Sequence, residues 1–275
     1  MISSIDPYRG LAQIYEEIRP SYPLRLIEDV VDRTGIRKDA RLLEIGAGTG
    51  KATVQFAEKG FRIHAIELGE DMARILMEKC APYPNVTLDI IPFEKWDASG
   101  EQPYDLIYSA QAFHWLDTGT KFQKCHDRLR DGGWLALFWY HPSDEEIPET
   151  RQVEEEISAI LARYAAPDSP KEKVSEKYTY TASPLQDEKQ AEIESSGLFE
   201  FREKITYTDE TTNNASQYLK VKKSIPAFTA ILNSLEDHMV EKVEREIEDA
   251  IMAHGGEVRT RFEFSLYLAR KRDSR

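Results

Sequence analysis

The sequence predicts an α/β protein built on a doubly wound, seven-stranded sheet that is mostly parallel, with an antiparallel edge strand and a helical lid. Three observations predict this fold. Strand-like and helix-like segments alternate through residues 40–140, and a glycine-rich loop follows the first of these strands. Near the end of the chain, two further strand-like segments flank a helical stretch, which is typical of an antiparallel pair at a sheet edge.

The first half of the chain supplies five strands and three helices. Short apolar runs predict strands over residues 40–46, 61–67, 86–91, 105–110 and 134–140. Between them, helical patterns cover residues 51–60, 70–80 and 118–130. The triplet Asp131-Gly132-Gly133 is expected to form a turn that closes the third helix. Repeated strand–helix–strand units imply right-handed crossovers, and therefore a parallel sheet with helices on both faces.

The second half is less regular. Apolar residues at helical spacing predict a helix over residues 151–164, and a second one over about 236–254. Between residues 165 and 190 the composition is typical of a loop, whereas residues 199–208 alternate as a strand does. We expect one domain over residues 1–275. Its ligand-binding core is predicted at about 35–140, its late strands at about 198–208 and 257–270, and its lid segments at about 1–25, 141–190 and 209–255.

Composition excludes several classes of protein. The net charge of −13 argues against a protein that grips nucleic acid through its phosphates. No apolar run reaches the length of about 18 residues that a membrane span needs, and the N-terminal residues lack the pattern of a signal peptide. Two cysteines, Cys80 and Cys125, have no metal-ligand spacing. We therefore expect a cytoplasmic protein without a metal, a nucleic-acid partner or a membrane partner.

The glycine loop predicts a nucleoside site. Glu44-Ile45-Gly46-Ala47-Gly48-Thr49-Gly50 follows a strand and precedes a helix, so its backbone can approach a ligand closely and the helix offers free N–H groups to an anion. Glu67 ends the next strand, about 20 residues further on, where doubly wound folds place an acidic residue on ribose hydroxyls. The G-x-G-x-G spacing differs from the G-x-G-x-x-G of dinucleotide-binding proteins.

This loop resembles that of the class I S-adenosylmethionine (SAM)-dependent methyltransferases. The resemblance extends to AIELGEDM, FEKWD, YDLIYSAQAFHWLD and LRDGGWLALFWY, which have the order and spacing of the small-molecule enzymes of type 11/25. The N-terminal YEEIRPSYP is also similar. The resemblance implies a Rossmann-like fold, SAM as cofactor with S-adenosylhomocysteine as product, and no metal.

The resemblance also implies the cofactor residues. The glycine loop would hold the methionine end, Glu67 the ribose, Leu68 the adenine, and the backbone of Ala110 the methionine ammonium. Many relatives have Asp before the residue that matches Phe93, whereas this chain has Pro92, so Glu94 or the backbone would contact the adenine. The predicted cofactor site comprises Glu44, Gly46, Ala47, Gly48, Gly50, Glu67, Leu68, Phe93, Glu94 and Ala110.

Other residues are candidates for the acceptor site. His114 follows the fourth strand and is the candidate general base, with orientation of a loop as the alternative role. Trp115 could form a wall of the cavity. Arg19 could pair with a carboxylate of the substrate or of SAM, and the alternative is a surface ion pair. The predicted substrate-binding residues are Tyr15, Arg19, Tyr22, His114 and Trp115.

We expect methyl transfer to a small-molecule acceptor, through a carboxylate or hydroxyl oxygen as one option. The alternatives are a non-catalytic SAM-binding protein and an NAD-dependent oxidoreductase, which the glycine spacing disfavours. A nucleic-acid methyltransferase is disfavoured by the charge and by Ser-Ala-Gln-Ala-Phe where an Asn-Pro-Pro-Tyr type loop would lie. The sequence leaves the acceptor open, as it does the choice between a monomer and a homodimer.

Overall fold

The computed structural model describes residues 9–273 apart from residues 98, 146 and 165–184. Within the chain, contacts define two compact units. Unit 1 contains residues 1–140, 184–207 and 264–275, and unit 2 contains residues 141–183 and 208–263. Residues 1–8 and 165–184, which belong to the predicted lid segments and loop, lie outside the described residues.

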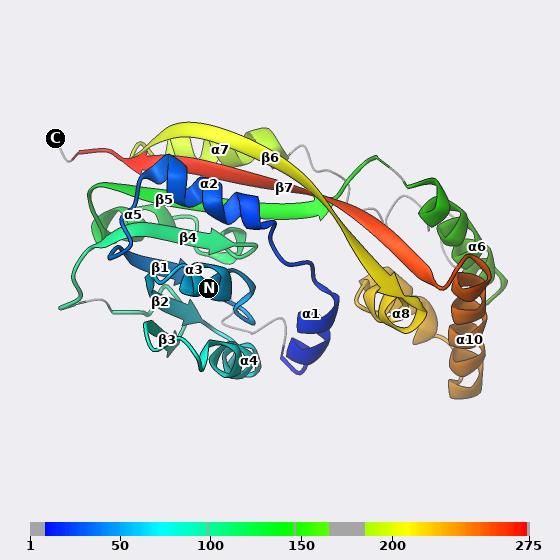
Figure 1. Cartoon of the computed structure of the whole chain (residues 1–275). Helices are drawn as coiled ribbons and strands as arrows, with labels where there is room; N and C mark the ends of the chain where they lie inside the picture. The colour runs from blue at the N-terminus through cyan, green and yellow to red at the C-terminus, as the bar shows by residue number, and fades with distance from the viewer. Residues whose placement is uncertain (1–8, 98, 146, 165–184, 274–275) are drawn as a thin grey trace. The chain divides into compact units, whose positions relative to one another are not determined.

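A seven-stranded sheet has the order β3-β2-β1-β4-β5-β7-β6 (Figure 1). Its strands are β1 (Arg41–Ile45), β2 (Arg62–Glu67), β3 (Val86–Ile90), β4 (Tyr104–Ala110), β5 (Leu129–Pro142), β6 (Phe199–Asn214) and β7 (Glu257–Lys271). The first five pair in parallel, and β7 runs against β5 and β6. The predicted doubly wound sheet, mostly parallel with an antiparallel edge, is thus confirmed.

Two strands are longer than predicted. The triplet Asp131-Gly132-Gly133 lies inside β5, where a bulge shifts the register against β4 between Tyr104 and Leu106. Gly132 takes a positive φ of 68°, so the left-handed bend expected of a turn is present, but the ladder continues around it. The predicted turn is therefore wrong as a boundary. Strand β6 also continues past Thr208, to Asn214.

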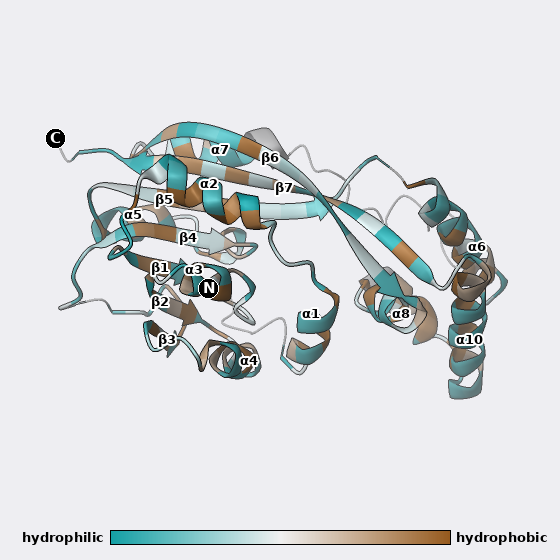
Figure 2. Cartoon of the chain, in the orientation of Figure 1, coloured by the Kyte–Doolittle hydropathy of each residue, from teal (hydrophilic) through white to brown (hydrophobic). Residues whose placement is uncertain are grey.

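Helices cover both faces of the sheet in unit 1. They are α1 (Ala12–Ile18), α2 (Leu24–Thr34), α3 (Lys51–Glu58), α4 (Glu70–Cys80), α5 (Lys121–Arg128) and α7 (Leu185–Ser195), with a 3₁₀ turn η1 (Phe113–Trp115). Strand residues alternate between the faces: Leu43 and Ile45 pack with Phe122 of α5, whereas Tyr108 packs on Phe56 of α3 with ring centroids 4.5 Å apart. In Figure 2, helix α2 carries both hydrophobic and hydrophilic residues, as expected of a helix that packs one side on a sheet.

Unit 2 has a separate core. Its helices are α6 (Pro148–Tyr164), α8 (Ala215–Lys223), α9 (Pro226–Leu232) and α10 (Asp237–Ala253). The apolar positions predicted for the helices over 151–164 and 236–254 supply Val153, Ile157, Val243 and Ile247 to that core, so both helices are confirmed. Among the described residues, no helix is long and apolar enough to cross a membrane.

Candidate functional site

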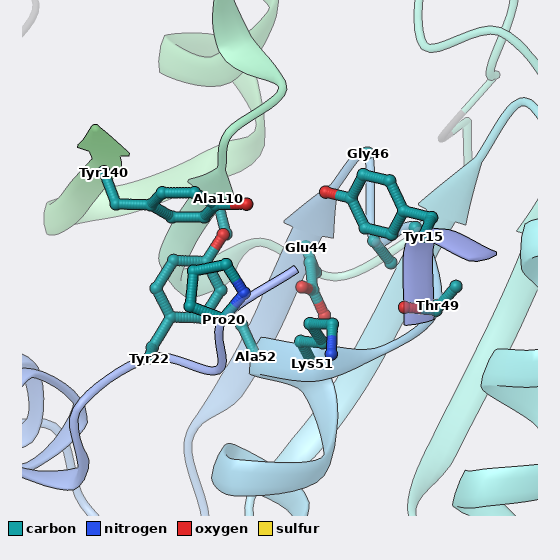
Figure 3. A pocket seen from close by; sticks show the side chains of 12 residues that line it. Tyr15, Pro20, Tyr22, Glu44, Gly46, Thr49, Lys51, Ala52, Ala110 and Tyr140 are labelled. Atoms are coloured by element: carbon teal, nitrogen blue, oxygen red, sulfur yellow. The ribbon is translucent and has the colours of Figure 1, made fainter. Parts of the chain in front are cut away.

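A small hollow lies in unit 1 at the carboxyl ends of β1 and β4 (Figure 3). This is where ligands bind in open α/β sheets, because loops rather than strands surround that edge. Three sources supply its walls: the N-terminal segment, the glycine loop with the start of α3, and the ends of β4 and β5. The lining residues are Tyr15, Pro20, Tyr22, Glu44, Gly46, Ala47, Gly48, Thr49, Lys51, Ala52, Ala110 and Tyr140.

Glycine is needed at different positions of the loop for different structural reasons. Gly46, Gly48 and Gly50 all have a positive φ, which favours glycine. A Cβ on Gly46 would lie 2.3 Å from the Cβ of Ala112, so this glycine permits close packing of two backbone segments. A Cβ on Gly48 would meet nothing within 4 Å. Gly48, which lines the hollow, therefore has open space where a side chain would begin, as expected of a backbone that approaches a ligand.

Glu67 fixes the glycine loop from the end of β2. Its side chain is 9% exposed. Its Oε2 accepts a hydrogen bond from the Gly48 N–H at 2.7 Å, and its Oε1 accepts one from the Gly69 N–H at 2.8 Å. The carboxylate thus links the loops that follow β1 and β2. It stands beside the hollow rather than among its lining residues.

Glu44 is a buried carboxyl group at the floor of the hollow. It lies on β1 and is 1% exposed. Its Oε2 accepts hydrogen bonds from the hydroxyls of Thr53 (2.5 Å) and Tyr108 (2.8 Å), whereas its Oε1 is buried with no hydrogen-bond partner in the described chain. Burial raises the pKa of Glu44 to about 7, against the lowering effect of the two hydroxyl donors. Because Glu44 Oε1 is buried without a hydrogen-bond partner, it is suited to bind a cationic group of a ligand.

The N-terminal segment is anchored over the glycine loop by polar contacts. Glu16 accepts from Lys79 Nζ at 2.7 Å, and Lys51 Nζ donates to the Glu16 carbonyl at 2.9 Å. Further along, the Gln55 side-chain amide donates to the Tyr22 carbonyl at 2.7 Å. These contacts bring the rings of Tyr15 and Tyr22 to the hollow, as Figure 3 shows.

The opposite wall comes from the ends of β4 and β5. Ala110 and Tyr140 line the hollow there. Between them along the sheet edge, Gln111 has a φ of 59°, a left-handed conformation that is uncommon for a side-chain-bearing residue. Its N–H donates to the Phe138 carbonyl at 3.0 Å and its side-chain amide donates to the Tyr140 carbonyl at 2.8 Å. These two bonds compensate for the strain and hold the chain after β4 in place.

His114 and Trp115 lie on η1, outside the lining of the hollow. Trp139 Nε1 donates to His114 Nδ1 at 3.1 Å, so Nδ1 is an acceptor and the neutral ring carries its proton on Nε2. Partial burial, together with the ammonium groups of Lys189 and Lys121, lowers the pKa of His114 to about 4. Trp115 is 56% exposed and stacks loosely on His114, with ring centroids 4.9 Å apart.

The segment after β3 contains the residues predicted to contact adenine. Phe93 is 4% exposed and its ring stacks on Trp96, with centroids 6.2 Å apart. Glu94 is exposed, and its Oε1 accepts from the Asp117 N–H at 3.1 Å. Lys124 of α5 donates to backbone carbonyls of this segment. The segment is therefore ordered by contacts from two other parts of the chain.

The structure brings together only part of the predicted site. The hollow is lined by the predicted residues Tyr15, Tyr22, Glu44, Gly46, Ala47, Gly48 and Ala110. The other predicted residues do not line it: Arg19, Gly50, Glu67, Leu68, Phe93, Glu94, His114 and Trp115. Arg19 lies over the Tyr15 ring at 5.6 Å, and Gly50 would bring a Cβ within 3.1 Å of Leu76.

Sequence reasoning missed Pro20, Thr49, Lys51, Ala52 and Tyr140. Pro20 is in the YEEIRPSYP segment and Lys51 directly follows the glycine loop, so both carried a positional signal. Tyr140 ends an apolar strand and had no local signal. Among the described residues, no three His, Cys, Asp or Glu side chains gather in a way that could hold a metal ion.

Comparison with known proteins finds similarity to methyltransferases over part of the chain. Residues 42–133 match the methyltransferase domain family, and this region contains the glycine loop, Glu67 and the segment after β3. A methyltransferase-like protein of Schizosaccharomyces pombe is 31% identical over 156 residues, which are 54% of this chain and 56% of that protein. The family match therefore covers about a third of the chain, and the match to the S. pombe protein about half of it.

Solved structures agree with this methyltransferase fold. A protein described as a type II methyltransferase of Anaeromyxobacter dehalogenans superposes with a TM-score of 0.60 at 24% identity, over 92% of this chain and 97% of that one. A SAM-dependent methyltransferase of Thiobacillus denitrificans, in complex with S-adenosylhomocysteine, superposes with a TM-score of 0.50 at 14% identity, over 98% and 100% of the two chains. Matches to curated relatives span about half of their length, 56% in the S. pombe protein.

The residues at the hollow suit SAM, the cofactor that the sequence predicts. The unpartnered Glu44 Oε1 suits the ammonium of a methionine group, and the open side of Gly48 leaves room for a chain passing close to the backbone. Glu67 is at the end of β2, where a ribose would follow.

Proposed function

We propose that this chain transfers a methyl group from SAM to a small-molecule acceptor. The observation that carries the proposal is the pairing of a buried carboxyl oxygen without a partner and an open glycine backbone in one hollow, at Glu44 and Gly48. When bound, SAM supplies a methyl group already activated by its sulfonium. The protein's part is then to bind, align and exclude water.

Each part of the hollow has a proposed task. Glu44 binds the methionine ammonium through Oε1, and the glycine loop passes beside the methionine end. Glu67 accepts from the ribose hydroxyls while it keeps the loop in place. Tyr22, edge-on to Phe138 with centroids 4.9 Å apart, and Tyr140 form an aromatic wall that excludes water from the reacting atoms.

The state of His114 favours one class of acceptor. A group whose conjugate acid has a pKa of about 4 binds a proton weakly at neutral pH. We therefore propose an acceptor oxygen that is already ionised, a carboxylate, which needs no base. In this proposal His114 orients the chain after β4 through its bond with Trp139. Arg19 and Trp115 remain proposed substrate contacts.

The wider assignments are also proposals. We keep residues 1–275 as one methyltransferase domain, with the helical segments as the part that selects the acceptor. Neither nucleic acid nor a membrane is proposed as a partner, and the net charge of −13 supports this for nucleic acid. Buried free thiols at Cys80 and Cys125 support the reducing cytoplasm as the compartment.

A titration followed by product analysis tests the proposal. The chain is titrated calorimetrically with SAM, S-adenosylhomocysteine and NAD, and so are Glu67→Ala and the exposed control Glu78→Ala. We expect micromolar binding of SAM and its product, none of NAD, and at least tenfold weaker binding only in Glu67→Ala. Formation of S-adenosylhomocysteine is then measured with carboxylate, phenol and amine acceptors.

Each outcome separates the alternatives. NAD binding without SAM binding would refute the methyltransferase and favour an oxidoreductase. SAM binding without turnover on any acceptor class would favour a non-catalytic SAM-binding protein. Turnover on amines but not on carboxylates would refute the proposed acceptor class alone.

A further inference from the structure

One ammonium group ties the segment after β3, residues 91–96, to helix α5. Lys124 Nζ donates to the backbone carbonyls of Phe93 at 2.5 Å, Trp96 at 2.7 Å and Glu94 at 3.1 Å. It also lies 4.9 Å from the centroid of the Phe93 ring and 5.9 Å from that of Trp96. An ammonium has three N–H donors, so the three carbonyls can take up all of them.

These bonds decide which way the peptide groups face. In a trans peptide the C=O of one residue and the N–H of the next point in opposite directions. Because Lys124 draws the Phe93 carbonyl toward α5, the Glu94 N–H points away from α5. Within the described residues this N–H has no protein acceptor, while the Glu94 carboxylate accepts from the Asp117 N–H. The segment thus offers a backbone donor to a ligand.

The order of the strands places this donor on the path of a nucleoside. The glycine loop follows β1, Glu67 ends β2, and residues 91–96 follow β3, which are three neighbouring strands in the order β3-β2-β1. Ligands of doubly wound folds run along the carboxyl edge of the sheet. A ligand with its amino-acid end on the first loop and its ribose at Glu67 therefore brings its base to residues 91–96.

We propose that Lys124 is a positioning residue for recognition of the adenine base. It holds the backbone of residues 93–96 so that the Glu94 N–H donates to the ring nitrogen N1 of the base. The inference rests on the proposed function, because it takes the ligand to be SAM or S-adenosylhomocysteine. It assigns base recognition to the backbone, which accounts for Pro92 in place of an acidic residue.

The test compares two bases in four proteins. Dissociation constants are measured for S-adenosylhomocysteine and for S-inosylhomocysteine. The base of the second ligand carries a proton on N1, so N1 cannot accept a hydrogen bond there. The proteins are wild type, Lys124→Met, Lys124→Arg and the control Lys95→Met, which removes an exposed ammonium from the same segment. Each is measured well below its own unfolding temperature.

We expect the wild type and Lys95→Met to prefer the adenine ligand at least tenfold. In Lys124→Met we expect binding of the adenine ligand to weaken about tenfold and that of the inosine ligand to change little, so that the preference is lost. Lys124→Arg, which keeps donors for the carbonyls, should recover most of the preference.

Three results would overturn the inference. They are unchanged adenine affinity in Lys124→Met, an equal loss for both ligands, which is what general structural support would give, and failure of Lys124→Arg to recover the preference. If Lys124→Met does not fold, Lys124→Leu, which also lacks donors for the carbonyls, takes its place with the same expected results. If the wild type binds neither ligand, the proposed function fails, and this is distinct from binding without a base preference, which refutes the role of Lys124 alone.

Discussion

Replacement of Glu44 by Gln should change how the stability of the protein depends on pH. Glu44 has a pKa of about 7 in the folded chain and an ordinary value of 4.5 when unfolded. Between these values the folded state binds more protons than the unfolded state, so the free energy of unfolding falls as the pH rises. The contribution is fully present below pH 4.5 and is lost as the pH rises through 7.

The size of this loss follows from the two pKa values. Between pH 5 and pH 8 they correspond to about 2.5 kcal/mol of unfolding free energy. Gln cannot titrate, but its side-chain oxygen can still accept from Thr53 and Tyr108. Its amide group at the unpartnered position adds a cost that does not depend on pH. All other titrating groups are shared, so their effects cancel in the difference between the two proteins.

Urea unfolding followed by tryptophan fluorescence at pH 5, 6, 7 and 8 measures this difference. Relative to Glu44→Gln, the wild type should lose about 2.5 kcal/mol between pH 5 and pH 8. The exposed control Glu78→Gln should follow the wild type at every pH. A constant difference between wild type and Glu44→Gln over this range would refute the reasoning, because Glu44 would then titrate alike in both states.

Three further predictions concern neighbouring parts of the site. Gly46→Ala should cost about 3 kcal/mol or more of stability in urea unfolding, since its Cβ would lie 2.3 Å from the Cβ of Ala112 at a φ of 70°; a loss under about 1 kcal/mol contradicts this. Glu16→Ala should speed cleavage after the exposed Glu17 by a glutamate-specific protease while changing global stability by less than about 1 kcal/mol, because it removes the ion pair with Lys79; unchanged cleavage would show that this pair does not anchor the segment. The ring of His114 should titrate below pH 5 by NMR, and a midpoint near its ordinary value of 6.5 would refute the effect of burial and the neighbouring ammonium groups.

Local sequence was sufficient to predict those features whose signal lies within a short stretch of the chain. The glycine loop, the apolar strands on either side of it and Glu67 all lie within about 30 residues, as expected of a strand–helix–strand unit. The positive φ values of the loop follow from its glycines, and the two strands follow from short apolar runs that the fold buries. The apolar stripes of α6 and α10 in unit 2 could also be recognised in the local sequence.

Other features depend on contacts that form only in the folded chain. Residues 209–214 are polar and resemble a loop, yet they continue β6, where Glu210 accepts from Arg261 of β7 at 2.8 Å. Tyr140 becomes part of the site only because the N-terminal segment places Tyr22 beside it, with ring centroids 6.1 Å apart. Neither the pKa of Glu44 nor the role of Lys124 is visible in local sequence, because each depends on groups from several strands and helices.

In the proposed site, the backbone at Gly48 approaches SAM. The most direct test is the affinity of Gly48→Ala for S-adenosylhomocysteine against that of Gly35→Ala. Both glycines have a left-handed φ, 57° and 62°, and a Cβ on either would meet nothing within 4 Å. Each variant should therefore lose about 1 kcal/mol of stability. We predict at least tenfold weaker binding in Gly48→Ala and unchanged binding in Gly35→Ala, whereas equal affinity in the two variants would contradict the site.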